Sequence, residues 1–371
     1  MAPVTVLIVD DSPSVRAVLR RFLARSDALR VIGEAADGVA AVEAVRRLRP
    51  DVLLLDLVLP GLDGFGVLER LAESGAVPTV ILTSRADRSE VRAAFEALGS
   101  GAVDLLPKPD DPASWHQLAE TLPDVLCVAA ASAGAPGRPR KGRVGRGGAL
   151  GESASPPAAR AATPHSARPG VVAGERTERS SPLAWLALGA STGGPAALRD
   201  LLAALPVPSP LRVVIVQHIA AGFEPGLADW LAGSLGLDVR VAVDGELVPP
   251  GSVRVAPAGS HLKVDREGRL TLDSTTPPRR GHRPSVDELF LSLAEHEPAT
   301  TAAALLTGMG ADGAAGLAAL RQGGALCLVQ DEASSAVFGM PRAALELGAA
   351  EAALPPREIG EELARRTRER R

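Results

Sequence analysis

The stretch Ala184-Trp185-Leu186-Ala187-Leu188-Gly189-Ala190-Ser191-Thr192-Gly193-Gly194 joins an apolar run to a glycine-rich turn. The apolar run predicts a buried strand, and the small residues after it allow the backbone to bend sharply into a helix. A strand, a tight turn and a helix in this order form the unit of parallel α/β sheets. The hydroxyl of Ser191 stands at the turn, where a substrate can approach it, so Ser191 is a candidate nucleophile. Residues 189–194 alone would also suit a phosphate-binding loop or a structural turn.

Apolar runs continue to alternate with amphipathic stretches towards the C-terminal end. Further strands are expected at 212–217, 253–256, 301–307 and 325–330, and 262–272 is typical of an antiparallel hairpin. We therefore predict an α/β domain over residues 183–360, with a doubly wound, mostly parallel sheet and an antiparallel hairpin. A charged tail is expected at 361–371.

A second α/β region precedes this one. Apolar runs at 6–9, 31–34, 52–55, 77–82 and 102–106 alternate with amphipathic stretches, which predicts a five-stranded parallel sheet within residues 1–126. Residues 127–182 are rich in glycine, proline and arginine, so we expect a flexible, basic linker there. A chain of 371 residues is long enough for two such domains.

Composition limits the possible classes of protein. With 46% hydrophobic residues, 23% charged residues and a net charge of -4, the chain is expected to be globular and shows no nucleic-acid-binding signature. The two cysteines, Cys127 and Cys327, lie in apolar runs, which favours reduced thiols and a cytoplasmic location. No leader is recognisable and no apolar run approaches the roughly 18 residues of a membrane span, so neither secretion nor membrane insertion is expected.

Polar residues follow several strands of the first region. Asp10 and Asp11 follow the first strand, Asp56 the third, Thr83 ends the fourth, and Lys108 follows the fifth. Because the carboxyl ends of parallel strands share one edge, these side chains should converge. Clustered carboxylates suit Mg²⁺, which also accepts phosphoryl oxygens. Asp56 is the candidate phosphoryl acceptor, supported by the charge of Lys108 and the hydroxyl of Thr83.

Residues 3–126 resemble the receiver domain of response regulators, on these five positions, on the stretch 56–64 and on Lys108-Pro109. The resemblance implies a flavodoxin-like fold, Mg²⁺-dependent phosphorylation of Asp56 by a histidine kinase, and a cis peptide bond before Pro109. Leu105 stands where receivers often carry an aromatic residue, so aromatic rotation cannot be the signal of this domain.

The candidate nucleophile needs a base. His218 directly follows the expected strand 212–217, which places it on the same sheet edge as Ser191, so His218 is the favoured general base. Two other histidines, His261 and His282, remain rivals, and His282 is the more serious of them because it lies in a turn-like segment.

An orienting carboxylate is also required. Asp312 lies in a glycine-rich loop after the strand 301–307, and it fits this role better than Asp287 or Asp331. The order Ser191, His218, Asp312 differs from the serine, acid, histidine order of α/β-hydrolases, although the turn matches their G-x-S-x-G pattern. Backbone N–H groups at Thr192 and Met309 could bind an oxyanion.

Residues 184–356 resemble the catalytic domain of chemotaxis protein-glutamate methylesterases, the CheB family. The resemblance rests on 189–195, Gln217-His218, 283–287, 308–313 and 338–341. It implies that Ser191 is the nucleophile, His218 the base and acid, Asp312 its partner, and the Thr192 and Met309 N–H groups the oxyanion hole. It further implies hydrolysis of γ-glutamyl methyl esters on the cytoplasmic helices of methyl-accepting chemoreceptors, deamidation of receptor glutamines, and no cofactor at the esterase site. Phosphorylation of the receiver relieves its inhibition of the esterase in this family.

Other functions fit the sequence less well. A nucleotide-binding output domain would need a different glycine spacing around residues 189–194, and a DNA-binding regulator would need a helix-turn-helix pattern. The remaining alternative is a catalytically silent, receiver-controlled adaptor that docks on signalling proteins. The long linker lowers the effective concentration of the receiver at the esterase, so inhibition is expected to be weaker than with a short tether.

Overall fold

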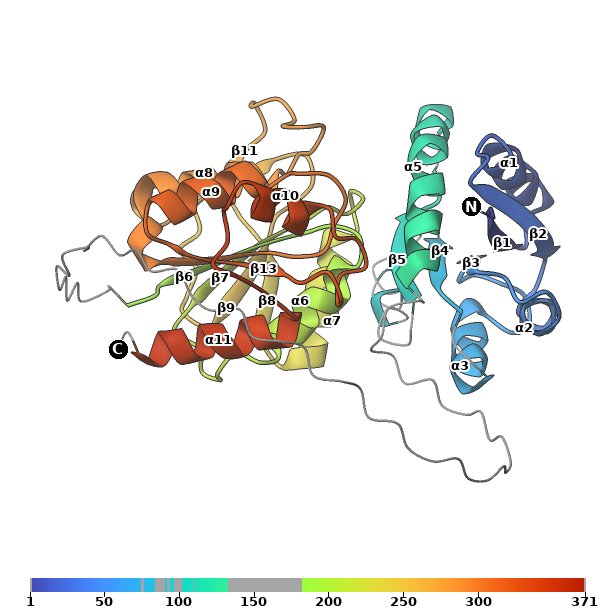
Figure 1. Ribbon diagram of the computed structural model, residues 1–371, viewed down its shortest axis with the longest axis horizontal. Helices are drawn as coiled ribbons and strands as arrows, with labels where there is room; N and C mark the ends of the chain where they lie inside the picture. The colour runs from blue at the N-terminus through green and yellow to red at the C-terminus, as the bar shows by residue number, and fades with distance from the viewer. Residues whose placement is uncertain are drawn as a thin grey trace, which may run out of the picture.

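The structure is a computed structural model, which describes residues 2–74, 77–83, 91, 94–96, 102–109, 111–132 and 182–369. Residues 133–181, which make up most of the expected linker, lie outside these ranges. The described residues form two α/β regions, one on each side of the expected linker (Figure 1). No helix within them is long and apolar enough to cross a membrane.

The first region contains a five-stranded parallel sheet with the strand order β2-β1-β3-β4-β5. The strands are β1 (Val4–Val9), β2 (Leu29–Ala35), β3 (Val52–Leu55), β4 (Thr79–Thr83) and β5 (Ala102–Pro107). The helices are α1 (Pro13–Leu23), α2 (Gly38–Leu48), α3 (Gly64–Ser74) and α5 (Pro112–Ser132). The predicted five-stranded parallel sheet is confirmed.

Local sequence explains where two of these helices begin. The Ser12 hydroxyl accepts a hydrogen bond from Val15 N (3.4 Å) at the start of α1, and Asp37 Oδ1 accepts one from Ala40 N (2.8 Å) at the start of α2. Such caps satisfy N–H groups that have no partner within the helix. Each helix therefore starts soon after the preceding strand ends, which keeps the polar residues between them at the sheet edge.

The structure corrects two details of this region. Helix α5 continues to Ser132, beyond the expected boundary at residue 126, because Leu126 and Ala129 are still buried against the sheet. The cis peptide bonds of the described chain precede Pro208 and Pro284, and not Pro109. Lys108 reaches the acidic residues without such a bond.

The second region contains a seven-stranded sheet with the order β14-β13-β12-β6-β7-β9-β8, and every pair in it is parallel. Its strands are β6 (Trp185–Ala190), β7 (Arg212–Gln217), β8 (Asp238–Val241), β9 (Ser252–Val255), β12 (Thr301–Leu305), β13 (Leu326–Gln330) and β14 (Ala352–Leu354). The predicted antiparallel hairpin is confirmed as a separate pair, β10 (His261–Val264) and β11 (Leu270–Asp273).

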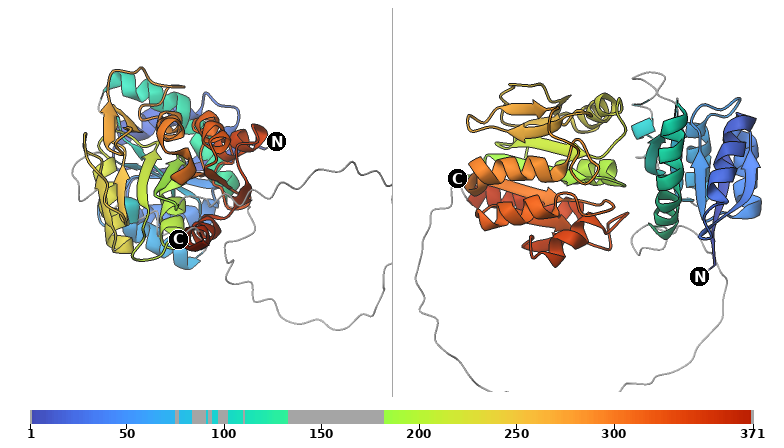
Figure 2. Two further views of the ribbon diagram at one scale, coloured as in Figure 1. Left: turned by 90° about the vertical axis from the view of Figure 1, so that its left-hand side faces the viewer. Right: turned by 90° about the horizontal axis from the view of Figure 1, so that it is seen from above.

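Helices cover both faces of this sheet (Figure 2). One face carries α6 (Gly194–Leu202), α7 (Glu224–Leu235) and α11 (Pro356–Glu369). The other carries the hairpin with α8 (Val286–His296), α9 (Ala314–Gln322) and α10 (Met340–Glu346). Residues 361–369, expected as a charged tail, are the last turns of α11, because Leu363 and Ala364 continue its buried face while the arginines and glutamates remain outside.

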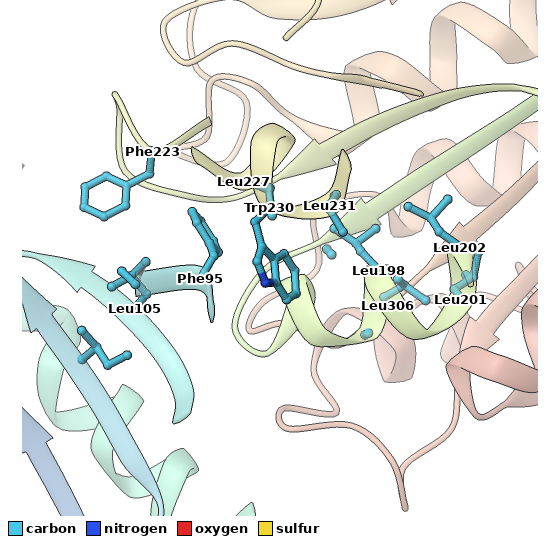
Figure 3. Packing of buried hydrophobic residues seen from close by; sticks show 14 of the residues in the cluster. Phe95, Leu105, Leu198, Leu201, Leu202, Phe223, Leu227, Trp230, Leu231 and Leu306 are labelled. Carbon is cyan, nitrogen blue, oxygen red and sulfur yellow. The ribbon is translucent and has the colours of Figure 1, made fainter. Parts of the chain in front are cut away.

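The two regions meet through a hydrophobic contact (Figure 3). The ring of Phe95 stacks against Trp230 of α7, with ring centroids 5.9 Å apart and an angle of 28° between the planes. Leu105 of β5 belongs to the same buried cluster, together with Phe223 and Leu227. The side of the first sheet that ends in β5 therefore packs against the second region.

Candidate active site

Ser191 lies directly after β6, at the carboxyl edge of the central strands. Ala190, the last residue of β6, pairs with Gln217, the last residue of β7, and His218 N donates to Ala190 O (2.9 Å). Ser191 and His218 therefore lie at the ends of adjacent strands. Ser191 N also donates to Thr307 O (3.0 Å), which ties the serine to the segment that follows β12.

Two glycines allow the backbone to pack closely around Ser191. Gly193 has φ 75°, and a Cβ atom there would lie 2.5 Å from the Cβ of Ala336. A Cβ atom on Gly308 would lie 2.7 Å from the Cβ of Ser191. A side chain at either position would push neighbouring atoms away, so both glycines are needed for the observed position of the serine.

His218 and Asp312 form a buried pair. His218 Nε2 lies 2.9 Å from Asp312 Oδ2, and the two side chains are 9% and 1% exposed. An ionised carboxylate accepts hydrogen bonds only, so Nε2 carries the proton and Nδ1 keeps its lone pair. Nδ1 is buried and has no hydrogen-bond partner among the described residues. The imidazole is thus set up to accept a proton at Nδ1.

The Asp312 carboxylate accepts hydrogen bonds from the beginning of α8 as well. Oδ1 accepts from Ser285 Oγ (2.7 Å) and Asp287 N (3.1 Å), and Oδ2 accepts from Val286 N (2.8 Å). Burial alone would raise the pKa of Asp312, but the hydrogen bonds from His218, Ser285 and Val286 lower it to about 2. Asp312 is therefore ionised at neutral pH, and the helix N-terminus favours its negative charge.

The rival histidines have other surroundings. His261 is buried, its Nδ1 accepts a hydrogen bond from Ser285 N (3.2 Å), and its Nε2 lies 3.2 Å from Pro277 O. Both of its nitrogens are thus used to hold the chain in place. His282 lies against His218, with parallel rings whose centroids are 3.8 Å apart. Neither histidine has a hydrogen bond to a carboxylate.

The rival carboxylates also serve the surrounding backbone. Asp287 Oδ1 accepts a hydrogen bond from Gly316 N (2.7 Å), so its side chain joins α8 to α9. Asp331 Oδ1 accepts one from Ser334 N (3.2 Å) in the turn after β13. Among the three candidates, Asp312 is the carboxylate that contacts His218.

The residues expected to bind an oxyanion lie on two sides of Ser191. Thr192 follows Ser191 directly, and its carbonyl accepts a hydrogen bond from Thr307 Oγ1 (2.9 Å). Met309 follows Gly308, which packs against Ser191, and its side chain is 39% exposed at the rim. The two backbones therefore approach the serine from opposite segments.

Two residues of this site escaped the sequence analysis. The Gln217 side-chain amide donates to Ser191 O (2.7 Å) and to His218 O (3.0 Å), so one buried group holds the backbone of both residues. Ser285, whose hydroxyl binds Asp312, is the other. The position of Ser285 just before a helical stretch was a usable signal, because serine is common there as a helix cap.

The first region contributes a contact at the mouth of this site. The Thr192 side chain lies close enough to the Asp104 carboxyl group on β5 to favour its ionised form. Burial raises the pKa of Asp104 to about 6, although the hydrogen bond from Leu105 N and the Thr192 side chain oppose this. The first region therefore touches the residue next to Ser191.

The acidic residues of the first region converge as predicted. Ligand oxygens of Asp10, Asp11 and Asp56 all lie within 4.8 Å of one another. Lys108 Nζ lies 2.8 Å from Asp10 Oδ2 and 2.5 Å from Asp56 Oδ2. Burial raises the pKa of Asp56 although Lys108 lowers it. Three carboxylates and the hydroxyl of buried Thr83, which has no hydrogen-bond partner among the described residues, fit a site for a hard cation and an incoming phosphoryl group.

Each of the two regions matches a known protein family. Residues 186–363 match the family described as CheB methylesterase, and residues 6–120 match the response regulator receiver domain. The chain is 40% identical over 356 residues to protein-glutamate methylesterase/protein-glutamine glutaminase 4 of Geobacter metallireducens, covering 96% of each chain. It is also 40% identical over 357 residues to protein-glutamate methylesterase/protein-glutamine glutaminase 5 of Myxococcus xanthus, covering 96% of this chain and 95% of the relative. The catalytic domain of Thermotoga maritima CheB methylesterase, a crystal structure, is 36% identical with a TM-score of 0.48, over 49% of this chain and 98% of that one.

Proposed function

The chain belongs to the family of protein-glutamate methylesterases/protein-glutamine glutaminases, and on this premise we propose how its residues carry out and control the reaction. It is a receiver-controlled esterase that hydrolyses γ-glutamyl methyl esters and deamidates glutamine side chains. Its substrates are the cytoplasmic helices of methyl-accepting chemoreceptors, so it works in the cytoplasm. The buried His218–Asp312 pair beside Ser191 is the observation that carries the proposal.

Acylation begins at Ser191. Its Oγ attacks the ester carbonyl carbon while His218 Nδ1 takes the hydroxyl proton. The N–H groups of Thr192 and Met309 bind the negative oxygen of the tetrahedral intermediate. His218 then returns the proton to the leaving methoxide, or to the side-chain amide nitrogen of a glutamine substrate, and methanol or ammonia departs. The product of this half-reaction is a glutamyl ester of Ser191.

Deacylation uses the same proton transfers, with water in place of Ser191 as the nucleophile. His218 Nδ1 takes a proton from water, the resulting hydroxide attacks the acyl carbon, and Ser191 Oγ leaves with the proton that His218 returns. The released side chain is a free glutamate. Asp312 keeps the Nε2 proton in place and stabilises the imidazolium that forms twice in each cycle.

The first region supplies control. Asp56 is the phosphoryl acceptor and receives the group from a histidine kinase, with Asp10, Asp11 and Asp56 holding Mg²⁺. When bound, Mg²⁺ supplies positive charge for the phosphoryl oxygens. Lys108 adds a second positive charge, and the Thr83 hydroxyl binds the newly attached group.

Inhibition is the role we assign to the contact between the two regions. The stacking of Phe95 on Trp230 holds the two regions together, and the contact of Asp104 with Thr192 brings the first region next to Ser191, which supports this role. Phosphorylation of Asp56, which lies two strands away from β5, releases this contact and opens the site.

Methanol release tests the proposal. The full-length protein is incubated with a methylated receptor fragment, with and without a small phosphodonor and Mg²⁺. Ser191→Ala should abolish methanol release, whereas the exposed Ser234→Ala on α7 should retain it. Methanol release by Ser191→Ala at the wild-type rate would refute the assignment of the nucleophile, and no release by the wild type would favour a silent adaptor.

A further inference from the structure

A second imidazole lies over the face of the proposed base. The rings of His282 and His218 are parallel within 3°, with centroids 3.8 Å apart. The contact involves the face of the His218 ring, while its two nitrogens lie in the ring plane, with Nε2 at Asp312 and Nδ1 without a hydrogen-bond partner among the described residues. His282 can therefore act on His218 without competing for its proton.

His282 is held by a tight turn. Its backbone exchanges two hydrogen bonds with Arg279, of 3.1 Å and 2.9 Å. Between them, Arg280 and Gly281 both have positive φ, 51° and 86°, as in the two-residue turns that join antiparallel strands. The ring of His282 thus projects from a fixed backbone and not from a long unpaired loop.

The same short segment also supports the other member of the pair. Three residues after His282, Ser285 Oγ and then Val286 N donate hydrogen bonds to Asp312. Residues 282–286 therefore contact His218 on its face and Asp312 on its oxygens. One segment fixes both the orientation of the imidazole and its carboxylate partner.

We propose that His282 is a positioning residue for the esterase reaction, whose neutral ring holds the His218 imidazole in its observed orientation and stabilises the imidazolium formed in each proton transfer. The inference rests on the proposed function. A neutral aromatic face attracts a cation placed over it, and stacked rings also resist rotation of the imidazole. A bulky aliphatic side chain would fill the same space, but it would neither attract the imidazolium nor stack on its ring.

The surroundings of His282 keep its own ring neutral. Burial and the nearby His218 lower the pKa of His282, while Asp312 opposes them more weakly. The groups that shift the pKa of His282 are His218 after β7 and Asp312 before α9. Arg279, which pairs with His282 in the turn, interacts with Asp312, Asp287 and Glu288. A charge on both rings at once would be unfavourable, so the His282 ring stays neutral when His218 becomes an imidazolium.

Substitutions at residue 282 separate an aromatic role from space filling. We compare His282→Phe, His282→Leu and His282→Ala in the full-length protein, measuring kcat and KM for methanol release. The Phe variant should stay within about threefold of wild-type kcat, and the Leu and Ala variants should lose roughly tenfold with little change in KM. His296→Ala, at the end of α8 and outside the site, is the matched control.

Several outcomes would overturn the inference. They are an unchanged kcat in the Leu variant, an equal loss in the Phe and Leu variants, or an effect confined to KM, which would make His282 a substrate contact. If His282→Ala does not fold, the Phe and Leu pair still decides the question. Wild type and Ser191→Ala run in the same assay, so a failure of the proposed function is seen separately, as an inactive wild type or an active Ser191→Ala.

Discussion

Replacing Asp312 with asparagine tests whether the carboxylate determines which nitrogen of His218 carries the proton. The carboxylate accepts four hydrogen bonds, from Ser285 Oγ, Val286 N, Asp287 N and His218 Nε2. An amide has one accepting oxygen and one donating nitrogen. If the oxygen faces Ser285, the amide nitrogen faces His218 and Val286, so His218 must accept at Nε2 and carry its proton at Nδ1. The base then has no lone pair towards Ser191.

The expected effects are large for activity and moderate for stability. Loss of the correct tautomer costs about 10⁴ in kcat in a serine protease with the equivalent change, so we expect a loss of about 10³ to 10⁴ here. The pKa of Asp312, lowered from 3.8 to about 2, corresponds to about 2 kcal/mol of folding stability at neutral pH. The unpaired Val286 N–H adds about 1–3 kcal/mol to the destabilisation.

Two measurements on the same preparations separate these effects. Methanol release gives kcat, and denaturant unfolding gives the free energy of unfolding. Asp331→Asn is the matched control, because Asp331 lies at the same sheet edge, directly after β13, without contacting His218; it should keep kcat within about threefold. A well-folded Asp312→Asn protein that loses less than tenfold in kcat would refute the tautomer argument.

Three further predictions concern control and pH. Phe95→Ala removes the stacking on Trp230 and should raise methanol release several-fold without a phosphodonor; an unchanged basal rate would contradict an inhibitory contact. Removal of Mg²⁺ with a chelator should abolish stimulation by a small phosphodonor and leave the basal rate within about twofold, and an equal loss of both would place a metal in the esterase reaction. Asp312 stabilises the fold above pH 3.8 and loses this contribution as the pH falls towards 2. Ser285→Ala removes one donor to Asp312 and should move acid unfolding, followed by circular dichroism, to higher pH; an unchanged transition would contradict the role of this hydrogen bond.

The sequence predicted much of both sites because parallel strands bring their carboxyl ends to one edge. Asp10, Asp56 and Lys108 follow long apolar runs, and the structure brings them together. His218 and Asp312 were found by the same reasoning, and they form a hydrogen bond across residues far apart in the chain. In each case the position relative to a strand, and not the residue type alone, carried the prediction.

What the sequence could not provide depends on long-range packing. The sequence pointed to Gln217 only as part of a stretch that resembles the family and to His282 only as a rival base, because their contacts depend on geometry that other segments fix. The edge strands β8 and β14 are short and only partly buried, so their apolar pattern is weak. The contact between Phe95 and Trp230 depends on how two separately folded sheets dock.

Both candidate sites lie where the strand order reverses. In the first sheet the chain passes from β1 to β2 on one side and then crosses to β3 on the other, and Asp10 and Asp56 follow the two strands that flank this point. In the second sheet β7 lies on one side of β6 and β12 on the other, so Ser191 and Asp312 also follow strands at the reversal. Loops leave such a point in opposite directions, which places the residues of both sites at the carboxyl edges of their sheets. Asp104 of the first region contacts Thr192, the residue next to Ser191, and we expect this contact to limit when the serine reacts. Control in this chain is therefore expected to act on access to Ser191, while the geometry of His218 and Asp312 stays the same.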